Sequence, residues 1–118
     1  MFFPSFFYER TVLSHLERVQ ELPPNVQAEI ASRVHNYIKL AKAANGEEWL
    51  ARLAAVAMEE QAKAIGQGVK STMDPRWAAP ALCEGWCRAM IGMSNGNLER
   101  PNAVAIIAAI EGFAKASA

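Results

Sequence analysis

The sequence predicts an all-α fold, a compact bundle of four to five helices. Apolar residues recur at intervals of three and four over several long segments, as they do along one face of a helix. Proline, glycine and asparagine separate these segments at regular intervals, where helices begin and end. No segment shows the apolar–polar alternation of a strand. We therefore expect one helical domain over residues 1–118.

The first helix is expected over about residues 6–21, and Ser5 can cap its first turn. Prolines follow directly in the segment 22–24, where they cannot continue a helical hydrogen-bond ladder. The apolar stripe of this helix repeats with helical spacing and consists of Tyr8, Val12, Leu13, Leu16 and Val19.

A second helix is expected over 24–44, because its opening proline suits a first helical turn. Asn45-Gly46 then stops it, since both residues accept the left-handed conformation that closes helices. A two-residue connection to the next helix predicts an αα-hairpin. The core stripe of the second helix is Val26, Ile30, Val34, Tyr37, Ile38 and Ala41.

The third helix is expected over 47–66, and two glutamates at its start suit the positive end of the helix dipole. Glu60 lies on its apolar face, where a carboxylate needs a cation or a hydrogen-bond donor nearby. A bridged structural residue and a member of a functional pocket are both open interpretations of Glu60. The predicted core stripe of this helix is Trp49, Leu53, Val56, Ala57 and Ala64.

Residues 66–74 are interpreted as a flexible loop, since glycines lie at its start. Asp74-Pro75 is a helix-start signal, but Pro80 follows closely. The expectation is a short turn over 75–79 and a fourth helix over 80–93. Its predicted inner face comprises Leu82, Cys83, Trp86, Met90 and Met93.

The fifth helix is expected over 101–115, and its residues 103–110 are all apolar. A helix that is apolar on all sides is expected to be buried on all sides. We therefore predict that this helix lies at the centre of the bundle or at the seam of a dimer.

Composition and charge narrow the function classes. The chain is 52% hydrophobic and 20% charged, and twelve basic residues balance twelve acidic residues. A neutral chain argues against general binding to nucleic acids or anionic membranes, which requires excess positive charge. No apolar run reaches the length of about 18 residues that a membrane span needs. The N-terminus lacks the basic region of a signal peptide, so we expect a cytoplasmic protein without membrane contact.

The sequence assigns no catalytic, cofactor-binding or metal-binding residue. Cys83 and Cys87 are one helical turn apart and are interpreted as buried, reduced thiols. His15 and His35 are expected on different helices, so they do not complete a zinc site with the cysteines. The cations near the 66–74 loop could contact an anion but fit a solvated surface equally well; they are Lys63, Lys70 and Arg76.

The N-terminus carries an unusual concentration of aromatic residues, which are favoured anchors of protein interfaces. These side chains either cover the protein's own core or contact a second copy or a partner protein. The second alternative assigns partner binding to Phe2, Phe3, Phe6, Phe7 and Tyr8.

The function expected from the sequence is that of a small non-enzymatic interaction or regulatory protein, such as an inhibitor, an anti-activator or an adaptor, with a homodimeric state. One alternative is a dimeric nucleic-acid-associated regulator, which a focused basic face would favour. The other is a small helical ligand-binding protein or enzyme. A polar pocket around Glu60 or Cys83 would favour that second alternative.

Overall fold

The computed structural model describes residues 5–44, 47–95 and 100–116, with side chains described for 12–44, 48–92 and 102–116. These residues form five α-helices and no strand, which confirms the all-α prediction. The Cα radius of gyration is 13.4 Å, close to the value of about 13.5 Å for a compact domain of this length. The helices are α1 (Ser5–Val19), α2 (Pro24–Ala44), α3 (Glu47–Gly66), α4 (Pro75–Asn95) and α5 (Arg100–Lys115).

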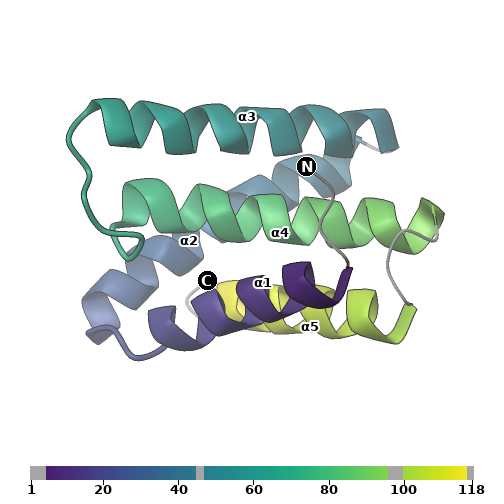
Figure 1. The fold of residues 1–118 in the computed structure, drawn as a ribbon, viewed down its shortest axis with the longest axis horizontal. Helices are drawn as coiled ribbons and strands as arrows, with labels where there is room; N and C mark the ends of the chain where they lie inside the picture. Colours follow the sequence, from purple (N-terminus) through teal and green to yellow (C-terminus); the bar gives the residue numbers. More distant parts are fainter. Residues whose placement is uncertain (1–4, 45–46, 96–99, 117–118) are drawn as a thin grey trace.

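The central helix of the bundle is α4, which packs against each of the other four helices (Figure 1). Trp86 is 1% exposed and is among the largest fully buried side chains. Its indole Nε1 donates to the Glu111 carboxylate of α5 at 3.2 Å, and Lys42 of α2 donates to the same carboxylate at 2.7 Å. This contact joins three helices around a buried aromatic ring, because a buried indole N–H requires an acceptor.

Within one chain, the C-terminal helix α5 is not buried on all sides, so its placement at the centre of the bundle was wrong, and its position at the seam of a dimer stays a prediction. Ile106 and Ile110 are fully buried against the core, but Val104 is 50% exposed. Ala105 and Ala108 face solvent as well. Alanine exposes little apolar surface, so an alanine-rich helix can lie at the edge of a bundle although it carries no polar residue over two turns.

The single helix α4 begins at Pro75. The prediction of a short turn over 75–79 and a separate helix from residue 80 was therefore wrong. The backbone amides of Trp77 and Ala78 donate to the Asp74 carbonyl at 2.9 and 2.8 Å, which starts the helix before Pro80. Pro80 lacks an N–H and removes only the hydrogen bond that the Arg76 carbonyl would receive. Pro80 is buried beside Ala79, and this packing keeps the helix continuous through it.

The third helix packs mainly against α4 and has fewer contacts with α2. Figure 1 shows α3 lying along α4, while α2 runs obliquely behind α4. Leu53, Ala57 and Ala64 of the predicted α3 stripe are buried, as expected. Trp49 and Val56 are each 42% exposed, so their assignment to the core was wrong. If α2 packed along the whole of α3, as the second helix of a close hairpin, it would cover these two side chains.

The connection from α3 to α4 begins with a Schellman motif. The amide of Val69 donates to the Ala64 carbonyl and that of Gly68 to the Ile65 carbonyl, both at 3.0 Å. Gly68 has a φ of 90°, a conformation that L side chains rarely adopt. Val69 is buried, as the hydrophobic contact of this motif requires. The flexibility assigned to residues 66–74 stays a prediction, and these hydrogen bonds oppose it.

The same connection is attached to α1. His15 Nε2 donates to the Thr72 carbonyl at 2.9 Å, and Arg18 donates to the Thr72 hydroxyl at 3.2 Å. The His15 ring also meets Trp77 of α4 edge-on, with ring centroids 5.5 Å apart. These contacts join α1 to the beginning of α4. Across the described helices, none combines the length and the apolar character that a membrane crossing requires.

Candidate functional site: a groove between α2 and α3

A groove of about 540 Å³ lies between α2, α3 and the first turns of α4. Its floor consists of small or compact buried residues of α3 and α4, namely Ala64, Ala79 and Pro80. The α2 wall is Arg33, Asn36, Tyr37 and Leu40, and the other lining residues are Glu60, Lys63 and Gln67 of α3 and Arg76 of α4. We call this feature the α2–α3 groove.

Helical spacing explains why these side chains share the groove. Arg33, Tyr37 and Leu40 of α2 are separated by four and three residues, so they lie on one face. Glu60, Lys63 and Gln67 of α3 repeat the same spacing. Because α4 lies between the two helices, these faces line a groove instead of packing into each other.

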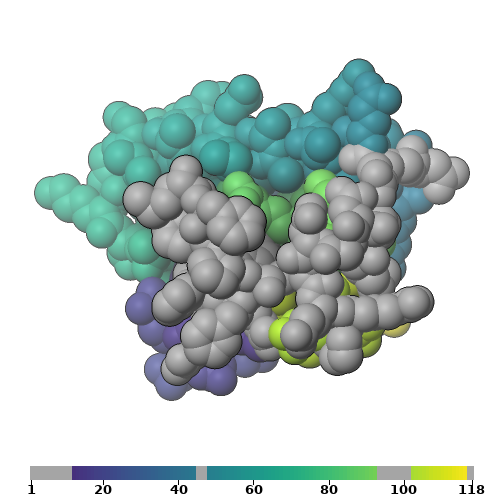
Figure 2. Space-filling model, turned by 45° about the vertical axis from the view of Figure 1, so that its right-hand side comes forward, coloured from purple at the N-terminus to yellow at the C-terminus, as the bar shows by residue number. Residues whose placement is uncertain are grey.

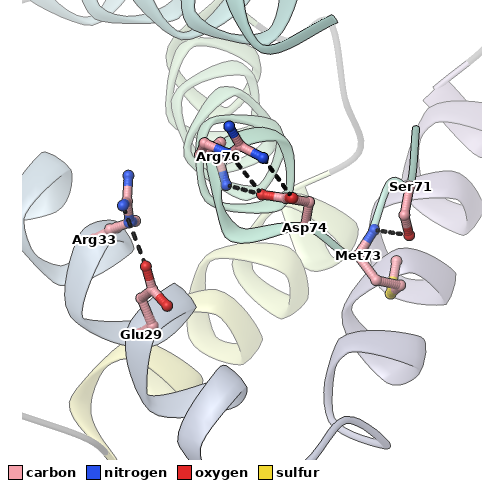
Figure 3. Close-up of polar contacts among 6 residues, drawn as sticks. All are labelled: Glu29, Arg33, Ser71, Met73, Asp74 and Arg76. Carbon is pink, nitrogen blue, oxygen red and sulfur yellow. Dashed lines mark hydrogen bonds and ion pairs between the residues drawn. The ribbon is translucent and has the colours of Figure 1, made fainter. Parts of the chain in front are cut away.

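Three cations from three different helices line the groove. Arg33 contacts the Glu29 carboxylate at 3.2 Å, and Arg76 contacts both oxygens of Asp74 through Nε and Nη2 at 3.2 and 3.1 Å (Figure 3). Lys63 has no ion-pair partner within the side chains that the structure describes. A guanidinium has five N–H donors, so both arginines retain donors beyond these contacts.

The Asp74 carboxylate fixes the Arg76 guanidinium at the edge of the groove. The side-chain hydrogen bonds from Arg76, and then the bond from its backbone amide, lower the pKa of Asp74. Asp74 is therefore charged at neutral pH and caps the first turn of α4. This cap orients Arg76 before any ligand binds.

The groove changes from cationic to apolar along its length. Leu40 is 62% exposed although it is a large apolar side chain. Val56 and Trp49 precede Glu60 by four and eleven residues, so they extend the groove-facing side of α3 toward its N-terminus. α2 and α3 run in roughly opposite directions (Figure 1), and Leu40, Val56 and Trp49 lie closer in sequence to the α2–α3 connection than Arg33 and Lys63 do.

Glu60 is half-buried and lines the groove, on the face that the sequence indicated. The phenol of Tyr37 also lines it. Burial, followed by the negative charge of Glu60, raises the pKa of Tyr37. Tyr37 therefore stays protonated at neutral pH and can donate a hydrogen bond to a ligand. Glu60 therefore lies in a polar pocket, which is the feature that would favour a ligand-binding protein or an enzyme.

Cys83 and Cys87 are free thiols with no exposed surface. The hydrogen bond with Cys87, together with burial, strongly raises the pKa of Cys83. A protonated, inaccessible thiol is a poor nucleophile. The predicted burial of Leu82, Cys83 and Trp86 is confirmed, and Cys83 does not line the groove. Met90 of the predicted inner face is partly buried, and the side chain of Met93 lies outside the described residues.

The remaining sequence candidates do not meet in one site. His15 contacts Thr72 and Trp77, none of which lines the groove, whereas His35 lies on α2. No group of three or more His, Cys, Asp or Glu side chains is placed to hold a metal ion among the described residues. Phe2 and Phe3 lie outside the described residues, and only the backbone of Phe6, Phe7 and Tyr8 is described, as part of α1.

Sequence reasoning found only part of the groove. It named Glu60 and noted that Lys63 and Arg76 bracket the α3–α4 connection, but it did not identify Arg33, Asn36, Tyr37 or Leu40 as neighbours of these residues. A local signal did exist for Leu40, because it lies outside the predicted core stripe of α2 and is large and apolar. The convergence with Arg33 depends on the angle between α2 and α4, for which the sequence has no local signal.

Comparisons with protein-family models, with curated proteins and with solved structures find no match to this chain.

Proposed function

We propose that this protein is a small non-enzymatic interaction protein that binds a partner protein through the α2–α3 groove and the exposed edge of α3 beside it. The observation that carries the proposal is the exposure of three large apolar side chains: Leu40 lines the groove, and Trp49 and Val56 lie on the side of α3 that carries Glu60. Exposed apolar groups that cluster beside polar ones are typical of protein interfaces.

The shape of the surface supports the same proposal. A groove of about 540 Å³ can receive anchor side chains of a partner, and buried anchors supply most of the binding energy at interfaces. Tryptophan and arginine are enriched among such anchors, and Trp49, Arg33 and Arg76 all lie on this surface. In Figure 2, α3, drawn in teal, forms the upper part of the molecule. The regulatory roles that fit are those of an inhibitor, an anti-activator or an adaptor.

Two further features belong to this proposal. We place the protein in the cytoplasm, which fits two free buried thiols that form no disulfide. We also propose a homodimeric state, in which the aromatic residues of the N-terminus are covered by a second copy. The interface with the partner then remains on the α2–α3 side.

A matched pair of variants tests the proposed interface. A photoreactive amino acid at position 56 identifies the neighbouring protein in the native host, and the purified partner is then titrated against three forms of the chain. Leu40→Glu should weaken binding at least about tenfold, because it places a charge among the anchors. Val104→Glu should leave binding unchanged, since Val104 is a similarly exposed apolar residue on α5. Equal loss in both variants, or binding that Leu40→Glu does not alter, would contradict the proposed surface.

A second candidate function is supported by the position of Glu60. The volume of the groove lies within the range of about 300–1,000 Å³ that is typical of small-molecule sites. Tyr37, Asn36 and Gln67 add hydrogen-bonding groups to the lining. A small helical protein that carries an acidic ligand is therefore the alternative, and the experiment below separates it from partner binding.

A further inference from the structure

We infer that the cationic end of the α2–α3 groove is a recognition site for a carboxylate, and that the partner segment bound in the groove presents an acidic side chain to Arg33, Lys63 and Arg76. This inference rests on the proposed function and specifies the chemistry of the partner.

The first step is the convergence of charge. Arg33, Lys63 and Arg76 come from α2, α3 and α4 respectively, and all three line one groove. Cations repel each other, so a folded chain that collects three of them around a hollow gains from an anion placed between them. The lining itself holds these three cations and one carboxylate, Glu60, while the carboxylates of Glu29 and Asp74, which pair with Arg33 and Arg76, lie outside it.

The second step is that two of the three cations are already oriented. Glu29 holds Arg33 from the same helix, and Asp74 holds Arg76 through two side-chain contacts (Figure 3). Both carboxylates lie outside the groove lining, so they position the guanidinium groups without occupying the groove. Preorganised donors lose less conformational entropy when a ligand binds. Arginine also matches a carboxylate geometrically, because its parallel N–H groups can bind both oxygens.

Lys63 is the cation most available to a ligand. Lys63 is exposed and has no ion-pair partner within the part of the chain that the structure describes. A carboxylate can therefore bind the ammonium group of Lys63 without breaking an existing ion pair. The protonated phenol of Tyr37 and the amide of Gln67 can complete the hydrogen bonds of the anion.

The apolar end of the groove makes the partner an acidic segment with a neighbouring hydrophobic anchor. Leu40 lies on the same face of α2 as Arg33, two helical turns along it. Two turns span about 11 Å. A partner segment that places an acidic side chain near Arg33 therefore needs an apolar side chain about 11 Å away from it to contact Leu40.

The test uses a probe that mimics one acidic side chain. N-acetyl-glutamate amide is titrated into the isotope-labelled full chain at low salt, and N-acetyl-glutamine amide serves as the neutral probe of the same shape. We expect saturable shifts of the amide signals of Lys63, Gln67 and Arg76 with the acidic probe only. Equal shifts with the neutral probe would overturn the inference, since recognition would then not depend on charge.

Three variants assign the binding to this site. Lys63→Gln should weaken binding of the acidic probe about threefold or more, whereas Glu60→Gln should strengthen it, because it removes a like charge from the lining. Lys70→Gln is the control, since Lys70 is an exposed lysine outside the groove lining. A Lys70→Gln effect as large as that of Lys63→Gln, or a Glu60→Gln effect of the opposite sign, would overturn the assignment.

The outcomes separate this inference from the proposed function. If the partner binds through Leu40 but the acidic probe shows no Lys63-dependent binding, the carboxylate site is wrong and the interface stands. If the probe binds as expected but no partner depends on Leu40, the proposed interface fails and the groove is the site of a small free acid. Selection of peptides from a displayed random library provides a further criterion. Binders sensitive to Leu40→Glu should carry aspartate or glutamate, and a set without acidic residues would overturn the inference.

Discussion

His15 shows how a single side chain can link the pH of the solution to the stability of the fold. Burial is the largest influence on its ring and lowers its pKa from the ordinary value of 6.5, and the nearby Arg18 acts in the same direction. The hydrogen bond to the Thr72 carbonyl opposes this shift but does not cancel it. The folded protein therefore binds a proton at His15 less readily than the unfolded chain does.

We expect the free energy of unfolding to decrease as the pH falls through 6.5 toward the lower folded-state pKa of His15. The sign follows because the unfolded chain takes up the proton first, so protonation favours unfolding. Urea denaturation between about pH 7.5 and pH 5 measures the slope. The variant His15→Gln retains an amide donor but does not titrate, and it should lose this part of the slope. A slope that persists in His15→Gln would show that another group is responsible.

Two glycines in different helices predict stability changes of opposite sign. A Cβ atom at Gly85 of α4 would lie 3.0 Å from Cγ1 and 3.2 Å from Cγ2 of Val12, where α1 approaches α4 closely. At Gly112 of α5 a Cβ atom would meet nothing within 4 Å. We expect Gly85→Ala to destabilise the fold by roughly 1–3 kcal/mol through overpacking. Gly112→Ala should stabilise it by about 0.5–1 kcal/mol, because alanine favours the helix.

Thermal or urea unfolding of the two alanine variants gives this comparison directly. Each variant adds one methyl group to a glycine within a helix, so the pair differs mainly in the space around the new atom. Two equal shifts would mean that α1 can move away from α4 without cost. That result would contradict the close packing of Val12 against α4.

At the scale of the elements, the bounds of α2 and α3 could be predicted because their signals are local. Pro24 fixes the start of α2, and Asn45-Gly46 separates the two helices. The prediction at Pro80 was wrong because it applied a local rule of the same kind. The packing of buried residues around Pro80 keeps the helix continuous there. The loss of one backbone hydrogen bond is smaller than the gain from a continuous helix that packs against four others.

The helices that pack together were harder to predict than the helices themselves. The short α2–α3 connection predicts neighbours, but it does not show that α4 would be the main partner of α3. Trp49 and Val56 were therefore assigned to the core, and the groove that they border was missed. Glu60 was identified because its position breaks an apolar pattern. Arg33 breaks no pattern, since an exposed arginine on a helix is ordinary.

The two sides of α5 provide a test at the scale of one helix. We expect Ile106→Asp to destabilise the fold by roughly 3 kcal/mol or more, because it buries an unpaired charge where Ile106 is fully buried. Val104→Asp should change the stability by less than about 1 kcal/mol, since half of Val104 is exposed. Circular dichroism during urea unfolding compares the two. Similar large losses would mean that Val104 is covered in solution, as it would be at a dimer seam.

At the scale of the whole molecule, polar side-chain contacts join the other helices to α4 and to the connection before it. Thr72, just before α4, is bound by His15 and Arg18 of α1, and the carboxylate of Glu111 connects α2, α4 and α5. Burial acts to raise the pKa of Glu111, but the hydrogen bonds from Lys42 and Trp86 outweigh it, and the resulting pKa is lowered. Glu111 is therefore charged in the folded protein at neutral pH.

The oligomeric state is the last property of the whole molecule that a direct experiment should decide. The N-terminus contains Phe2, Phe3, Phe6 and Phe7, and burial of one phenylalanine side chain contributes roughly 1.5–3 kcal/mol. If they remained exposed to water, these rings would form an aggregation-prone apolar patch, so we expect a second copy of the chain to cover them. Deletion of residues 1–7 should then weaken self-association and leave most of the helical content intact.

Light scattering measures the mass of the wild-type chain and of the truncated chain, and circular dichroism measures their helical content at the same concentrations. A homodimer that becomes a folded monomer on truncation is the expected result. Val104→Glu provides a control, because it adds a charge at an exposed apolar position of α5 and tests whether that helix forms the seam instead. A wild-type monomer would contradict the dimer. A truncated chain that unfolds would also contradict the expected result, which requires a protomer that stays folded without residues 1–7.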